Sequence, residues 1–178
     1  MSDGPDLVVL LDDAAQPIGT APRLTVHSDQ TPLHLAFSFH VLQPDGRTLI
    51  SRRALSKGTW PGVWSNACCG HPRPGEDTTD ALVRRVREEL GAEAVEVRCV
   101  LPGFRYRAVD ASGIVENEVC PVYVGQLADP EAVRPDPTEV ADYAWVEWAG
   151  LCAAAGAAPA VFSPWSVLQL ARLGDVLA

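Results

Sequence analysis

One amphipathic helix, which we predict over about residues 78–90, constrains the fold most strongly. Asp77 or Thr78 is suited to cap its N-terminus, and Gly91 follows as a typical C-terminal stop. Apolar side chains recur along one face of this helix, at about 100° per residue: Leu82, Val83, Val86 and Leu90. Because such a helix has to bury its apolar face, the chain needs a sheet or further helices to cover it.

Short segments with strand character occur on both sides of this helix. Each is an apolar or alternating run that ends in turn residues, as at residues 44–46. We predict strands at residues 7–11, 17–20, 34–42, 48–51, 95–101, 114–120 and 143–148, helices at 149–155 and 165–173, and loops at 23–32 and 130–137. This series predicts an α+β fold, with a mixed β-sheet sandwiched by helices, in a single domain over residues 1–178.

The composition excludes several classes of protein. The chain has 178 residues and 47% hydrophobic residues, enough for a buried core. Its longest apolar runs are far shorter than the roughly 20 residues of a membrane helix, so we expect no membrane partner. Without a basic, signal-like N-terminal segment we expect a cytoplasmic protein whose five cysteines are reduced thiols. The net charge of -9 argues against a nucleic-acid partner, but a local arginine cluster is compatible with a small anionic ligand.

Three of the four histidines lie in or beside predicted loops, namely His27, His34 and His71. Glu116 and Glu118 occupy alternate positions of a predicted strand, so their carboxylates project to one face and are able to share a cation. Imidazoles and carboxylates together suit zinc or manganese. The alternative is that these are ordinary hydrogen-bonded or solvated side chains. His40, inside an apolar strand, is better explained as a hydrogen-bonded core residue.

Two adjacent thiols, Cys68 and Cys69, directly precede Gly70 and His71. No second thiol pair with two-residue spacing is present in the sequence, which argues against a zinc ribbon. A buried cysteine usually acts as a small hydrophobic residue, and this is the default interpretation of both. An acid/base role would require an electropositive, partly exposed setting that lowers the thiol pKa from about 8.5.

Residues 70–92 join a glycine-containing loop to the predicted helix. Carboxylates in such a segment can hold a magnesium ion that is bridged to a diphosphate. An ordinary charged helix surface is the alternative, and it accounts for Glu88. Glu89 differs because the helical periodicity places it beside the apolar face, where a carboxylate needs a partner. Arg85, one turn earlier, lies at the same edge.

Residues 70–92 resemble the Nudix box, with Arg85 at a position where Nudix hydrolases have glutamate. This exchange removes a metal ligand and supplies a phosphate-binding group. From about residue 7 to the C-terminal helix, the chain also resembles the type 1 isopentenyl-diphosphate isomerases. The segments that carry this second resemblance are residues 33–37, 52–57, 60–64, 69–72, 104–107, 112–121 and 162–165.

The resemblance implies an isomerase that interconverts isopentenyl and dimethylallyl diphosphate through a tertiary carbocation. It implies Cys69 and Glu118 as acid/base groups, in either order, with help from Tyr106. Trp165 is a candidate to stabilise the cation. The implied ligands of one Mn²⁺ or Zn²⁺ are His27, His34, His71, Glu116 and Glu118. Mg²⁺ would bind Glu89, and the isoprenoid diphosphate would contact Arg23, Arg53, Lys57 and Arg85.

The chain departs from the family pattern at one further position, and two rival functions remain open. Arg23 stands where the family has a lysine, so a planar guanidinium replaces an ammonium group. A Nudix hydrolase that cleaves a nucleoside or isoprenoid diphosphate is the main rival function, although Arg85 argues against it. A non-catalytic metal-binding module is the other rival, in which thiols and histidines only hold the fold together.

Overall fold

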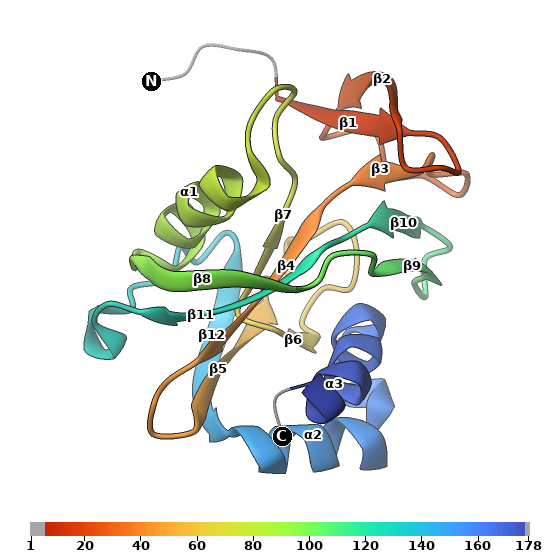
Figure 1. Ribbon diagram of the computed structural model, residues 1–178. Coiled ribbons are helices and arrows are strands. Elements are labelled where there is room, and N and C mark those ends of the chain that lie inside the picture. Colours follow the sequence, from red (N-terminus) through yellow and green to blue (C-terminus); the bar gives the residue numbers. More distant parts are fainter. Residues whose placement is uncertain (1–5, 177–178) are drawn as a thin grey trace.

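The computed structural model describes residues 6–176, which form twelve strands, three α-helices and two short 3-10 helices (Figure 1). The first sheet has the order β2-β1-β3-β10-β9. Its strands are β2 (Pro17–Pro22), β1 (Leu7–Leu11), β3 (His34–Leu35), β10 (Val115–Val119) and β9 (Arg105–Val109). None of the helices in residues 6–176 has the length and apolar character needed to cross a bilayer.

The second sheet has the order β12-β5-β4-β11-β8, and two short strands join it at β5 and β4. Its main strands are β12 (Val140–Glu147), β5 (Arg47–Arg53), β4 (Phe37–Leu42), β11 (Val122–Leu127) and β8 (Ala94–Leu101). The two short strands are β6 (Trp64–Ser65) and β7 (Cys68–Gly70). Both sheets are mixed, because β3 pairs with β10 and β4 with β11 in parallel, whereas the other pairs are antiparallel.

The predicted strand at residues 34–42 divides between the two sheets. β3 belongs to the first sheet and β4 to the second, and Ala36 lies between them. The β10–β11 segment crosses beside it in the same way, with backbone hydrogen bonds from Ala36 N to Val119 O (2.9 Å) and from Ser38 N to Pro121 O (3.1 Å). This paired crossing places residues of both sheets around one point, where the candidate site lies.

Helix α1 (Thr78–Leu90) has the predicted bounds. The Asp77 side chain accepts a hydrogen bond from Thr79 N, and Gly91 closes the helix in the left-handed region with φ of 60°. A Cβ atom at Gly91 would lie 2.7 Å from the carbonyl oxygen of Arg134, so glycine also permits a close loop contact. Local capping chemistry therefore explains both ends of the helix.

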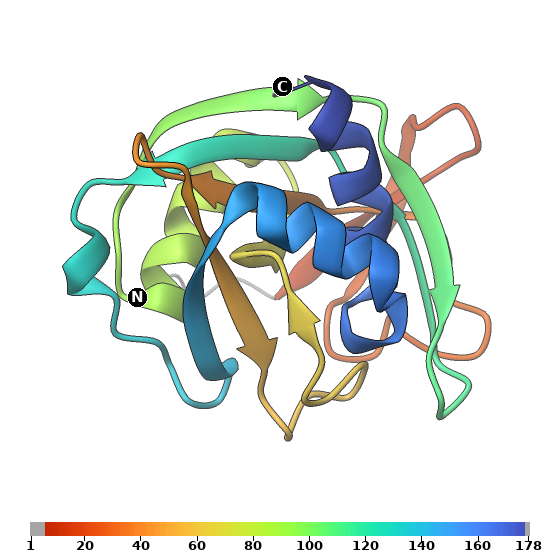
Figure 2. The ribbon, with the colours of Figure 1, turned by 90° about the horizontal axis from the view of Figure 1, so that it is seen from below.

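The helices cover both faces of the second sheet. The apolar side of α1 packs against the face that includes Phe37, Phe39 and Leu49. The opposite face, with Ile50, packs against α2 (Trp148–Ala157) and α3 (Pro164–Val176). Figure 2 shows α2 and α3 on the side of this sheet away from α1. The predicted α+β class, with a mixed sheet between helices, is confirmed, although the strands form two sheets.

His40 is a buried, hydrogen-bonded core residue, as predicted. Its Nε2 lies 2.9 Å from Gln169 Oε1, and Gln169 Nε2 donates to Ser38 Oγ at 2.9 Å. Burial lowers the pKa of His40 to about 4, although the hydrogen bond with Gln169 acts in the opposite direction. The folded chain therefore keeps this ring neutral at pH values where the unfolded chain protonates it.

When the pH falls from 7.5 to 5, we expect His40 to lower the free energy of unfolding by about 2 kcal/mol. Its contribution is complete above the unfolded pKa of about 6.5 and is lost as the pH falls toward the folded pKa of about 4. Urea unfolding of the wild type and of His40→Gln at the two pH values measures this. The variant should lose about 2 kcal/mol less on acidification. Equal losses in the two proteins would contradict the assignment.

Candidate metal centre and active site

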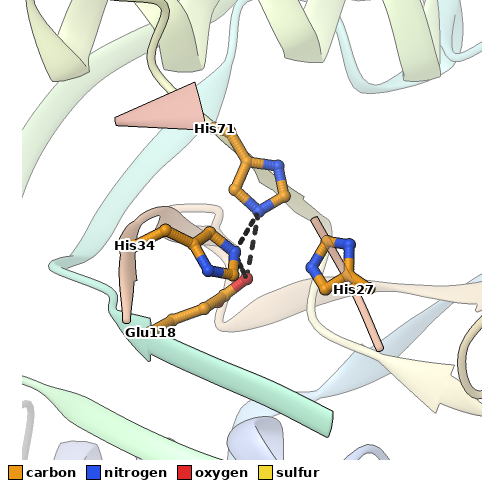
Figure 3. Close-up of side chains that lie close together, drawn as sticks. All are labelled: His27, His34, His71 and Glu118. Carbon is orange, nitrogen blue, oxygen red and sulfur yellow. Dashed lines mark hydrogen bonds and ion pairs between the residues drawn. The ribbon is translucent and has the colours of Figure 1, made fainter. Parts of the chain in front are cut away.

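Three histidines and a glutamate from separate segments meet beside the first sheet (Figure 3). His27 comes from a loop, His34 from β3, His71 from the segment after β7 and Glu118 from β10. One ligand atom of each lies within 4.8 Å of all the others. The parallel pairing of β3 with β10 places Glu118 directly opposite His34. His71 Nε2 lies 3.2 Å from His34 Nε2 and 3.1 Å from Glu118 Oε1.

The hydrogen bonds of these rings test whether the cluster fits a metal ion. His34 Nδ1 lies 2.9 Å from the carbonyl oxygen of Pro32, which only accepts, so Nδ1 is the donor. In the neutral ring, Nε2 then keeps its lone pair available for a metal ion, whereas only the protonated ring donates from Nε2 to Glu118. Within residues 6–176, the buried His27 Nε2 has no hydrogen bond of normal geometry. Three imidazole nitrogens and a carboxylate, oriented in this way, fit a divalent cation.

Protonation in this cluster is dominated by the shared Glu118 carboxylate. Burial favours its neutral form, but hydrogen bonds from His34 and His71 outweigh burial and hold the pKa of Glu118 well below its usual range. Burial lowers the pKa of His71. Burial also acts on His34, where the hydrogen bond and the charge of Glu118 outweigh it and raise the pKa. The structure thus presents Glu118 to its neighbours as a carboxylate.

Glu116 lies beside the four-residue cluster and is linked through Thr59 to the guanidinium group of Arg53. Its Oε2 is 2.9 Å from His27 Nε2, and its Oε1 accepts a hydrogen bond from Thr59 Oγ1 at 2.8 Å. Arg53 donates to the carbonyl and hydroxyl oxygens of the same threonine, at 2.9 Å and 3.2 Å. Thr59 is buried, and we did not predict it because an isolated loop threonine gives no sequence signal.

A cavity of about 510 Å³ opens beside the cluster. Every predicted site residue lines it except His34, whose side chain is fully buried. Residues from both sheets, from α1 and from α3 contribute to its walls. The thirteen predicted residues, spread from Arg23 to Trp165 in sequence, therefore gather around one space.

Cys69 lies on β7, and its thiol has polar neighbours. Its Sγ is 3.4 Å from Ser38 Oγ and 3.2 Å from both the Nδ2 and Oδ1 atoms of Asn66. Burial raises the pKa of this thiol to about 11, and the hydrogen bonds with Ser38 and Asn66 only partly oppose it. Burial also outweighs the charge of Arg53, so this thiol does not have the lowered pKa that we set as a requirement for an acid/base cysteine, and Cys69 holds its proton at neutral pH.

Cys68 has different surroundings, because neighbouring side chains of a strand point to opposite faces. It is only 2% exposed and packs in the core cluster that α1 covers. Its Sγ lies 3.5 Å from Glu89 Oε2. Cys69 instead packs against the cluster that contains Tyr106 and Trp165.

Two aromatic residues complete this end of the cavity. Tyr106 pairs with Glu118 across β9 and β10, and its hydroxyl donates to Glu118 Oε2 at 2.8 Å. Burial raises the pKa of Tyr106 well above its ordinary value, so the hydroxyl stays a donor. Trp165 Nε1 donates to Ser65 Oγ and Asn66 Oδ1, both at 3.1 Å. These bonds set the orientation of the indole, and the Arg53 guanidinium carbon lies 5.5 Å from its ring centroid.

The other predicted cations also line the cavity. Arg85 forms ion pairs with Glu89 one turn later and with Glu88 (2.8 Å). Lys57 forms an ion pair with Glu139, which we did not predict. Arg23 is farther out and more exposed, with its Nε 2.7 Å from an Asp6 carboxylate oxygen. Burial raises the pKa of Glu89, and the charge of Arg85 opposes that effect.

Comparison with known proteins finds a NUDIX domain over residues 32–166. The chain is 56% identical over 174 residues to the isopentenyl-diphosphate Delta-isomerase of Frankia alni, covering 97% of this chain and 88% of that protein. It is 55% identical to the protein of the same name from Cutibacterium acnes, with coverages of 97% and 89%. The corresponding protein of Mycolicibacterium vanbaalenii is 54% identical, with coverages of 97% and 93%.

Solved structures match the fold at much lower identity. The crystal structure of DR0079 from Deinococcus radiodurans aligns with a TM-score of 0.70 at 17% identity, over 93% of this chain and 98% of that one. The MutT protein from Methanosarcina mazei aligns with a TM-score of 0.60 at 18% identity, over 81% and 94%. At these identities the matches support the Nudix fold alone.

Proposed function

Because the chain belongs to the isopentenyl-diphosphate Delta-isomerase family of NUDIX-domain proteins, we propose that it interconverts isopentenyl and dimethylallyl diphosphate. One observation carries the proposal. A single cavity has Cys69 and the Glu118–Tyr106 pair in its walls together with four cations, Arg23, Arg53, Lys57 and Arg85. The first group suits proton transfer, and the cations suit a diphosphate.

The reaction adds a proton to one carbon of an unactivated alkene and removes a proton from another carbon. We assign these transfers to Cys69 and Glu118. In a reversible isomerisation each group gives a proton in one direction and takes it back in the other. The hydrogen bond from Tyr106 holds the Glu118 carboxylate in place. A thiol that holds its proton and an ionised carboxylate are complementary starting states for such a pair.

The carbocation formed between the two transfers needs a neighbour that stabilises charge without reacting. We assign this role to Trp165, since a cation over an indole face gains about 2 kcal/mol when both are desolvated. The hydrogen bonds of Nε1 to Ser65 and Asn66 keep the ring in one orientation. The apolar side chains packed around Trp165 also exclude water, which would otherwise capture the cation.

Two metal sites belong to the proposal. We assign one Mn²⁺ or Zn²⁺ to His27, His34, His71, Glu116 and Glu118, and Mg²⁺ to Glu89. When bound, these ions supply positive charge that tunes the acidity of Glu118 and neutralises the diphosphate. Arg23, Arg53, Lys57 and Arg85 would bind the diphosphate oxygens and thereby set the position of the alkene. We also propose a cytoplasmic location, where free thiols stay reduced.

Incubation of the purified protein with isopentenyl diphosphate, Mg²⁺ and Mn²⁺ or Zn²⁺ tests the proposal. We expect the acid-labile dimethylallyl product and no release of phosphate. A chelator should abolish turnover, and Mn²⁺ or Zn²⁺ together with Mg²⁺ should restore it. Release of phosphate or of a monophosphate would indicate a hydrolase instead. Metal binding with neither reaction would indicate a non-catalytic metal-binding module.

A further inference from the structure

Glu139 contacts two of the four cations that we assign to the diphosphate. Its Oε2 accepts from Lys57 Nζ, and its Oε1 lies 3.3 Å from Arg85 Nη2. The side chain is 19% exposed and lines the same cavity as both cations. Lys57 follows β5 and Arg85 lies on α1, so one carboxylate joins two elements that are far apart in sequence.

The proline-containing loop at residues 130–137 leads directly to Glu139. Arg134 N donates to Leu90 O at 2.8 Å, and Asp136 N donates to Glu89 O at 2.9 Å. These carbonyl groups belong to the last turn of α1, where no helical partner remains for them. The loop is therefore attached to the helix that bears Arg85.

Further hydrogen bonds fix the end of the loop that is next to Glu139. The Asp136 carboxylate accepts from the backbone and hydroxyl groups of Thr138, at 2.8 Å and 2.7 Å. The Asp136 carbonyl accepts from Glu139 N at 3.0 Å. Ala54 N donates to the carbonyl oxygen of Glu139 at 3.0 Å, which ties it to the segment that bears Lys57. Glu139 therefore projects from a backbone that is anchored both to α1 and to residues after β5.

The charges explain what such a carboxylate can do. Lys57 and Arg85 repel each other, and a lysine side chain on its own samples many rotamers. A carboxylate on an anchored loop restrains both cations before a ligand arrives, which lowers the ordering cost of binding. An ammonium group has three donors and a guanidinium has five. Each cation therefore has donors left for phosphate oxygens while it remains bonded to Glu139.

We propose that Glu139 is a positioning residue that holds Lys57 and Arg85 in place for the substrate diphosphate. This inference rests on the proposed function, because it assumes that these cations bind the diphosphate. A simpler role makes the opposite prediction. If Glu139 only supplied negative charge, it would compete with the diphosphate, and its removal would strengthen binding.

Two substitutions separate these roles. Glu139→Gln removes the charge and places an amide NH₂ group beside a cation. Glu139→Asp keeps the charge but shortens the reach by one methylene, so that one carboxylate no longer spans both cations. Positioning predicts weaker diphosphate binding in both variants. Charge alone predicts tighter binding for the first and unchanged binding for the second. Glu131→Gln is the matched control, because Glu131 is exposed on the same loop and does not line the cavity.

The measurements are the Kd of inorganic pyrophosphate with Mg²⁺, by calorimetry, and KM and kcat for isopentenyl diphosphate. For Glu139→Gln we expect Kd and KM to rise about tenfold, because a hydrogen bond to a charged group is lost. The kcat should change less than about threefold, because Glu139 acts on the cations Lys57 and Arg85 rather than on Cys69 or Glu118. Glu139→Asp should shift the same constants in the same direction, and Glu131→Gln should match the wild type.

Unchanged or lower Kd and KM in either Glu139 variant would overturn the positioning role. A failure of the proposed function would give a different experimental result. A wild type that binds pyrophosphate without isomerising its substrate would refute the isomerase assignment, while the Kd series would still decide the role of Glu139. A wild type that does not bind pyrophosphate would overturn both. Since Glu139→Asp preserves the ion-pair charge, it keeps the test decisive if Glu139→Gln fails to fold.

Discussion

Replacement of Cys69 by alanine should lower the rate of isomerisation by about a thousandfold or more, which is the scale of a lost acid/base group. The Cys69 thiol lines the cavity beside Tyr106 and Trp165 and keeps its proton at neutral pH. Alanine offers no proton in one direction and accepts none in the other. Because Cys69 is not among the proposed metal ligands, the bound metal per protein should stay at the wild-type level, which metal analysis measures alongside turnover.

Cys68→Ala is the matched control, since it removes a thiol from the neighbouring position. Cys68 also lines the cavity, but it is buried under α1, and its Sγ lies beside Glu89 rather than among the aromatic residues. We expect this variant to retain turnover within a few fold of the wild type and to lose mainly stability, about 1 kcal/mol for a small cavity. If Cys69→Ala turned over normally and Cys68→Ala did not, the choice of thiol would be wrong.

The different surroundings of the two thiols illustrate what a sequence can and cannot predict. Helix α1 was predicted to the residue, because Asp77 and Gly91 act on the backbone next to them. Strands β6, β7, β9 and β11 were not predicted. Their pairing partners lie far away in sequence, and β6 and β7 have only two and three residues. The position of Cys69 on a strand therefore became visible only in the structure.

The candidate site shows the same division between local and distant causes. The period-two pattern at Glu116 and Glu118 correctly predicted two carboxylates on one face. The polar partners of the site come from contacts between separate segments, and no local pattern marks them: Ser38, Thr59, Asn66 and Glu139. Burial is equally non-local. It raises the pKa of Cys69 to about 11, whereas the sequence-based requirement for an acid/base thiol was a lowered pKa.

The junction between the two sheets explains why the site lies where it does. β3 and β10 run in parallel, and each continues into the second sheet as β4 or β11. His34 and Glu118 belong to the first-sheet side of this crossing, whereas Cys69 on β7 pairs with β4 on the second-sheet side. Glu118 is therefore held on one sheet and Cys69 on the other. This arrangement suits two acid/base groups that act on different carbons of one substrate.

Replacement of Glu118 by glutamine should lower isomerisation by at least about a thousandfold, because one side chain would lose two functions. Glutamine has nearly the same shape, so the hydrogen bond from Tyr106 can persist. It lacks the charge that His34 and His71 share, and it cannot exchange a proton with a carbon atom at neutral pH. Steady-state turnover and metal content should be measured together, with Mn²⁺ or Zn²⁺ in excess.

Tyr106→Phe distinguishes the positioning of Glu118 by a hydrogen bond from proton transfer by Glu118 itself. It removes only the 2.8 Å hydrogen bond to Glu118 Oε2, so we expect a loss of about tenfold to a hundredfold with normal metal content. Excess metal should refill the site in Glu118→Gln without restoring turnover, because the missing carboxylate is also the proton-transfer group. Full isomerisation by metal-loaded Glu118→Gln would remove Glu118 from the chemistry and leave it as a metal ligand alone. A larger loss in Tyr106→Phe than in Glu118→Gln would instead transfer the acid/base role to the tyrosine hydroxyl.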